Sequence, residues 1–79
     1  MESDAQLLNA VAIVLRKLRE ERNFSQEYLA AEADLSRSMI DKIERRKRLP
    51  SLPVLIKIAG AFGMSASELV KRIEIDLNK

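Results

Sequence analysis

Cysteine, histidine and tryptophan are absent from this chain of 79 residues, and glycine and proline occur only twice each. Without cysteine there is no disulfide bond or thiolate metal site, and without histidine the commonest metal ligand and general base are missing. The two glycines, Gly60 and Gly63, lack the spacing, the lysine and the preceding strand of a phosphate-binding loop. The acidic residues Glu27 and Glu32 are typical of a solvated helix face rather than a hydrolytic pair. We therefore expect no metal, no cofactor and no enzymatic activity.

Long apolar runs are also missing. The longest, Asn9–Leu15, is far shorter than the roughly 20 residues that a membrane-spanning helix needs, and no charged and then apolar leader is present. We therefore expect a cytoplasmic protein without a membrane partner. The hydrophobic content of 47% predicts that residues 1–79 fold as one domain, near the lower size limit for an independent core.

The net charge is only +2, but the basic residues are concentrated in one segment. Between Ser36 and Arg48 there are six basic and two acidic residues, and the rest of the chain carries a net charge of −2. The last four basic residues form the run Arg45–Arg48. An arbitrary run of this kind is more often a solvated loop than a binding site, so its position along the chain has to decide its role.

Apolar residues recur at three- and four-residue steps, which predicts five helices and no strands. The first helix is predicted to begin at a capping box formed by Ser3 and Gln6 and to end near Arg22–Asn23. The second is capped by Ser25 and stops at Asp34–Leu35, and Ser36 caps the third.

The last two predicted helices follow Pro50, which interrupts the pattern. Ser51 caps the fourth helix, Leu52 to Phe62, in which Pro53 occupies the first turn, and Gly63 ends it. Ser65 and Glu68 have capping-box spacing at the start of the fifth helix.

The third predicted helix has one apolar and one polar face. Met39, Ile40 and Ile43 are predicted to be buried, which leaves an outward face formed by Arg37, Ser38, Asp41 and Lys42. Two short helices joined by a short turn are typical of the unit that presents a second helix to the major groove of DNA.

The segment LRKLREERNFSQEYLAAEADLSRSMIDKIERRKRLPSLPVLIKIAGAFGMSASELV strongly resembles the lambdoid-phage repressor/Cro-like (Xre-type) helix-turn-helix family, roughly from Val11 to Val70. The resemblance implies an all-α, five-helix, lambda-repressor-like DNA-binding domain, with the helix-turn-helix at Gln26 to Arg45 as its second and third helices. Stand-alone domains of this size resemble phage Cro-like repressors, the controller proteins of restriction–modification systems and some antitoxins.

The resemblance also implies roles for individual residues. Gln26 is expected to contact a DNA phosphate and to brace the first residue of the recognition helix. The expected base-reading residues are Arg37, Ser38, Asp41 and Lys42, and because arginine can donate two hydrogen bonds to guanine, we expect guanine in each half-site. Directly after a recognition helix, the basic run favours phosphate contacts by its four members, Arg45, Arg46, Lys47 and Arg48.

Two further features follow from the family pattern. Arg19 and Glu44 occupy the positions of an ion pair that ties the third helix to the first. Asp34 and Arg46 stand where the family usually has glycine. Asp tolerates the left-handed backbone of such a position, whereas for Arg46 the alternative is a third helix that runs further toward Leu49–Pro50.

Surplus apolar residues in the last helix, Val70, Ile73 and Leu77, either belong to core or terminal packing or form the interface of a homodimer that binds a palindromic operator. If an interface exists, we expect this helix to be its main contributor. The leading hypothesis is a bacterial or phage transcriptional regulator whose partners are double-stranded DNA, a second copy and RNA polymerase. The alternative is an antitoxin or protein-interaction module that binds a toxin and contacts DNA to regulate its own operon.

Overall fold

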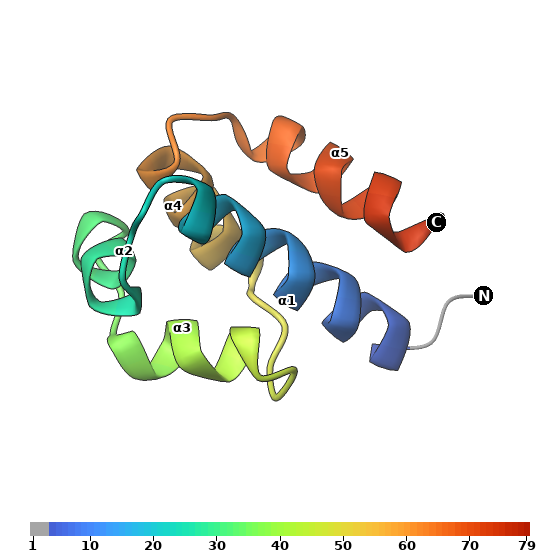
Figure 1. Cartoon of the computed structure of the whole chain (residues 1–79), viewed down its shortest axis with the longest axis horizontal. Helices are drawn as coiled ribbons and strands as arrows, with labels where there is room; N and C mark the ends of the chain where they lie inside the picture. The colour runs from blue at the N-terminus through green and yellow to red at the C-terminus, as the bar shows by residue number, and fades with distance from the viewer. Residues whose placement is uncertain (1–3) are drawn as a thin grey trace.

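The computed structural model describes residues 4–79, and within them it contains five α-helices and no strand (Figure 1). The helices are α1 (Asp4–Glu21), α2 (Gln26–Glu32), α3 (Arg37–Glu44), α4 (Leu52–Ala61) and α5 (Ala66–Leu77). The prediction of an all-α, five-helix fold is confirmed. The predicted helix-turn-helix corresponds to α2, α3 and the four residues between them.

The longest helix, α1, runs through the middle of the molecule and packs against α3 on one side and α5 on the other (Figure 1). α2 packs against α3, and α4 packs against both α2 and α5. The position of α3 therefore depends on two neighbours, α1 and α2. Its remaining side is left for solvent or for a partner.

Four serines begin four of the helices in the way the sequence predicts. The side-chain oxygens of Ser25, Ser36, Ser51 and Ser65 each accept a hydrogen bond from the backbone N–H three residues later. The capping box of Ser65 is complete, because Glu68 accepts a hydrogen bond from the Ser65 backbone N–H at 2.9 Å. Each such cap contributes roughly 1 kcal/mol to helix stability. The first predicted cap, Ser3, lies outside the described residues.

Four helices end with a residue in the left-handed conformation, and only one of these residues is glycine. In each case the N–H of the next residue bonds back to a carbonyl five positions earlier, at 2.8 to 3.0 Å, in the Schellman arrangement. The four residues are Asn23 (φ 56°), Asp34 (φ 56°), Arg46 (φ 62°) and Gly63 (φ 74°). The alternative that the third helix continues toward Leu49–Pro50 is wrong, because α3 ends at Glu44 and Arg46 turns the chain.

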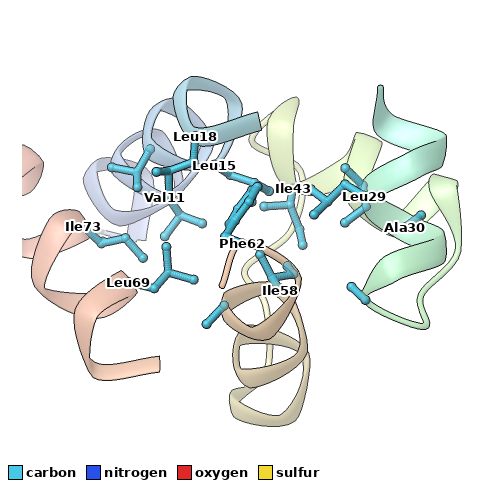
Figure 2. Close-up of a cluster of buried hydrophobic side chains, with 14 of the residues drawn as sticks. Val11, Leu15, Leu18, Leu29, Ala30, Ile43, Ile58, Phe62, Leu69 and Ile73 are labelled. Carbon is cyan, nitrogen blue, oxygen red and sulfur yellow. The ribbon is translucent and has the colours of Figure 1, made fainter. Parts of the chain in front are cut away.

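Apolar side chains from all five helices meet in one core, with Phe62 at its centre (Figure 2). Ile40 and Ile43 of α3 are fully buried, as predicted, whereas Met39 is only half-buried. Within residues 4–79 no single helix is long and apolar enough to cross a membrane. α4 and α5 meet that criterion only as a pair, and this pair is bent by 100°.

The backbone at Arg46 can be tested by substitution. We expect Arg46→Gly to be more stable than Arg46→Ala by about 1 kcal/mol, because both lose the arginine side chain and only glycine adopts φ near +60° without strain. The measurement is chemical denaturation of both variants. The same two substitutions at Arg48, whose φ is not positive, are the control, and there alanine should be the more stable. An equal or greater stability of Arg46→Ala would contradict the left-handed turn.

Candidate nucleic-acid interface

The outward face of α3 carries polar side chains. Buried apolar residues on the opposite face pack the helix against the core. Arg37, Ser38 and Lys42 are exposed, and Ser38 lies one residue after Arg37 in the first turn. Asp41 is half-buried, and its Oδ2 lies 3.6 Å from Nη1 of Arg45 in an i,i+4 pair. The four predicted base-reading residues are thus on α3 outside the core, and Asp41 is the least exposed of them.

Arg37 has a partner on the neighbouring helix. Its Nε lies 3.5 Å from Oε2 of Glu27 in the first turn of α2, and both side chains are largely exposed. The contact joins the two helix starts across the helix-turn-helix.

Glu44, the last residue of α3, has a fully buried carboxylate that joins three helices. Its Oε2 accepts a hydrogen bond from Nε of Arg19 at 2.7 Å, and its Oε1 accepts one from Nη2 of the same arginine at 3.0 Å. Oε1 also accepts hydrogen bonds from Gln26 at 3.1 Å and from Arg16 at 3.4 Å. Arg19 and Glu44, which the resemblance pairs, are therefore brought together in a bidentate contact, with α2 as a third participant.

The Arg19 side chain also fixes the connection between α1 and α2. Its Nη1 donates to the backbone carbonyl of Phe24 at 2.8 Å, so one guanidinium holds both this turn and α3. Hydrogen bonding to Glu44, opposed by burial, raises the pKa of Arg19 above its ordinary value. Burial disfavours the charged form of Glu44, but the hydrogen bonds from Arg19, Gln26 and Arg16 together lower its pKa below the ordinary value. Both groups are therefore charged at neutral pH.

Gln26 has a partner that the sequence did not predict. Its side-chain amide N–H donates to the Glu44 carboxylate at the end of α3. An arginine side chain carries only donors, so a brace to Arg37 would use the amide oxygen of Gln26, and that role of Gln26 remains a prediction. It is Glu27, the next residue, that contacts Arg37.

The basic segment after α3 is exposed at every position from Arg45 to Arg48. Its second member, Arg46, donates from Nε to Oδ1 of Asn9 on α1 at 2.6 Å. Arg46 also borders a surface hollow of about 260 Å³ between α1 and the end of α3, which Arg16 and Lys17 line as well. The left-handed turn thus directs one side chain back to α1.

Three of these contact residues, Asn9, Arg16 and Glu27, were not predicted from the sequence. Arg16 lies three residues before Arg19, one turn earlier on the same face of α1, so helical spacing could have placed it near Glu44. Nothing in the sequence pairs Asn9 with Arg46, because that contact depends on the left-handed turn. Glu27 was assigned to a solvated face, which describes its exposure but not its contact with Arg37.

The three predicted interface residues of α5 have different environments. Val70 is 37% exposed, Leu77 is half-buried, and Ile73 is 7% exposed and belongs to the core. For Ile73 the core-packing alternative is confirmed, because its side chain is buried within the chain itself. A hollow of about 180 Å³ lies beside it, lined by Leu7, Val11, Leu49, Pro50, Leu55, Val70 and Ile73.

Residues 15–69 match the sequence profile of the family described as Helix-turn-helix. The chain belongs to the helix-turn-helix family. The matched range begins in α1 and ends in α5, so it contains the recognition helix, the Glu44 network and the basic segment. Among residues 4–79 no group of three or more acidic side chains could hold a metal ion.

Two curated relatives of this helix-turn-helix chain are regulators by name. The control protein C.MunI of a Mycoplasma species is 46% identical over 61 residues, which cover 76% of this chain and 82% of that protein. The immunity repressor protein of Bacillus phage phi105 is 43% identical over 56 residues, which cover 71% of this chain. The matched part of the phage repressor is only 39% of its length.

A similar solved structure is the restriction–modification controller protein C.Esp1396I, as a tetramer in complex with its natural 35 base-pair operator. It has a TM-score of 0.83 and 30% sequence identity, over 92% of this chain and 96% of that one. The controller protein C.AhdI from Aeromonas hydrophila has a TM-score of 0.74 and 37% identity, over 78% of this chain and 94% of that one.

The buried carboxylate of this helix-turn-helix chain predicts acid lability. Because the pKa of Glu44 is lower in the folded chain, its contribution to stability is complete above the ordinary value of 4.5 and is lost as the pH falls through the folded value. We expect Glu44→Gln to lose about 3 kcal/mol at pH 7, since Arg19 keeps its charge without a counter-charge, and to lose less on acidification. Denaturation from pH 7 to pH 3 measures both effects.

Glu32→Gln, at an exposed position of α2, is the control and should follow the wild-type curve. Part of the acid dependence should remain in Glu44→Gln, because the hydrogen bond from the Ser65 backbone also lowers the pKa of Glu68. A Glu44→Gln variant with wild-type stability at every pH would contradict the assigned role of the network.

Proposed function

We propose that this chain is a sequence-specific DNA-binding transcriptional regulator that binds a palindromic operator as a homodimer. The observation that carries the proposal is the two-faced α3, which is fixed on one side by Ile40, Ile43 and Glu44 and presents Arg37, Ser38 and Lys42 on the other. A rigid polar helix next to a basic turn is what direct readout of the major groove requires.

The relatives support a regulator of the controller type. The match covers 82% of C.MunI and 96% of the operator-bound C.Esp1396I chain, but only 39% of the phage repressor. We therefore base the proposed function on the small controller proteins, which are regulators by name and not enzymes. Operator binding would occlude or recruit RNA polymerase in the cytoplasm.

The proposed base contacts come from the first two turns of α3. An α-helix with its side chains is about 10–12 Å across, so α3 fits the major groove, which is roughly 12 Å wide. Arg37 is assigned to guanine, Ser38 and Lys42 to neighbouring bases, and the half-buried Asp41 to a supporting position beside Lys42.

The proposed phosphate contacts come from both ends of the helix-turn-helix. Gln26 begins α2, and the exposed residues Arg45, Arg46, Lys47 and Arg48 follow α3. Since Arg46 already donates from Nε to Asn9, its Nη groups are the ones assigned to phosphate. These contacts add affinity without sequence preference.

A homodimer is proposed because one copy presents one recognition helix. Successive major grooves on one face of the duplex are about 34 Å apart, and the single α3 of one copy enters only one of them, so a two-groove site needs a second copy. Val70 and Leu77 remain the proposed contacts on α5. Leu52 and Ile56, exposed one turn apart on α4, add apolar surface to the interface that we propose.

The test is selection of bound sequences from a random pool of duplex DNA, followed by sequencing. We expect a two-fold symmetric site with guanine in each half, and we expect Arg37→Ala to lose the preference at one base pair per half-site, by about 5- to 100-fold. An unchanged motif in Arg37→Ala would refute the base assignment. Absence of any selected sequence at low salt would instead favour a protein-interaction module, such as a toxin-binding antitoxin.

Lys47 provides the matched test of a phosphate contact. We expect Lys47→Ala to weaken binding to operator and random DNA by similar factors, and to reduce the slope of log affinity against log salt by about one per monomer. Affinity titrations at several salt concentrations measure this slope. Lys71→Ala, at an exposed position of α5 far along the chain from the basic segment, is the control and should leave the slope unchanged.

A further inference from the structure

The salt bridge between Glu27 and Arg37 is separate from the Glu44 network. Nε of Arg37 lies 3.5 Å from Oε2 of Glu27, and the two side chains are 59% and 71% exposed. An exposed pair of this kind contributes only about 0–1 kcal/mol to stability, so the fold does not depend on it. We infer that Glu27 is a positioning residue for Arg37, and that it increases discrimination between bases rather than affinity for DNA. The inference rests on the proposed function of α3.

Arg37 occupies a position that is electrostatically unfavourable for a cation. It is the first residue of α3, at the positive end of the helix dipole, and the first turn of α3 contains no acidic residue. Glu27, in the first turn of α2, supplies the missing negative charge from the neighbouring helix. The negative charge of Glu27 therefore compensates both the positive end of the α3 dipole and the positive charge of the Arg37 guanidinium.

The geometry of the pair leaves the base-reading edge of Arg37 available. The contact with Glu27 is made through Nε, and the planar guanidinium carries four further N–H donors on its two Nη groups. Two parallel hydrogen bonds to O6 and N7 of guanine can be made from those groups. A carboxylate at Nε thus orients the guanidinium plane before DNA arrives, which reduces the rotamer entropy that binding has to remove.

The same carboxylate lowers affinity for DNA in general. A negative charge in the first turn of α2 repels the phosphates of every sequence to a similar extent. Its benefit is obtained only where the oriented Arg37 faces guanine. A uniform penalty combined with a sequence-dependent gain raises the ratio of specific to non-specific binding.

The test compares Glu27→Gln with Glu32→Gln on operator variants and on random duplex DNA. Both substitutions remove one negative charge from α2, but Glu32 takes part in no salt bridge within residues 4–79. The base pair read by Arg37 is the one whose preference is lost in Arg37→Ala. At that base pair we expect Glu27→Gln to reduce discrimination by up to about fivefold and to bind random DNA more tightly, while Glu32→Gln keeps wild-type discrimination.

Two further variants exclude a general structural effect. In an Arg37→Ala background, Glu27→Gln should alter base preference no further, because the residue it positions is gone. Glu27→Asp keeps the carboxylate and should retain most of the discrimination, with unchanged thermal unfolding as the check on folding.

Unchanged discrimination in Glu27→Gln, or an equal loss in Glu32→Gln, would overturn the inference while leaving the proposed function intact. A loss of preference at many base pairs at once would overturn it too, since positioning of Arg37 affects only its own base pair. A wild-type chain that selects no sequence would overturn the proposed function itself, and this inference with it.

Discussion

One buried carboxylate determines where the recognition helix lies. Glu44 is 2% exposed, and an ionised carboxylate at such a position is tolerated only with charged partners and filled hydrogen-bonding capacity. Arg19, Gln26 and Arg16 supply those partners from two other helices. Because hydrogen bonds are directional, they fix the end of α3 relative to α1 and α2 more narrowly than apolar packing does.

The helix ends provide the second constraint. Serine caps set the starts of α2 to α5, and left-handed residues set the ends of α1 to α4, so the turns on either side of α3 are both determined by backbone hydrogen bonds. In three of these turns the left-handed residue carries a side chain, and in one of them the side chain of Arg46 reaches α1. The basic segment therefore begins from a fixed position rather than from a loose loop.

Much of this could be predicted from the sequence, because the signals are local. Serine caps, helical periodicity and the breaks at Asp34 and Pro50 depend on residues within one or two turns, and they gave the five helices. Contacts between distant residues were harder. The Arg19–Glu44 pair came from family resemblance. The Asn9–Arg46 contact depends on a left-handed backbone at a residue other than glycine, and spacing alone could not distinguish Ile73 from an interface residue.

The division of α3 into an inward and an outward set has an evolutionary consequence. The inward set, Ile40, Ile43 and Glu44, is buried and holds the helix in position. The outward set, Arg37, Ser38 and Lys42, is exposed and lies outside the core. Mutations in the outward set are therefore nearly neutral for folding, and those in the inward set are not. Such a chain can acquire a new target by drift at a few surface codons, without a second mutation to restore stability.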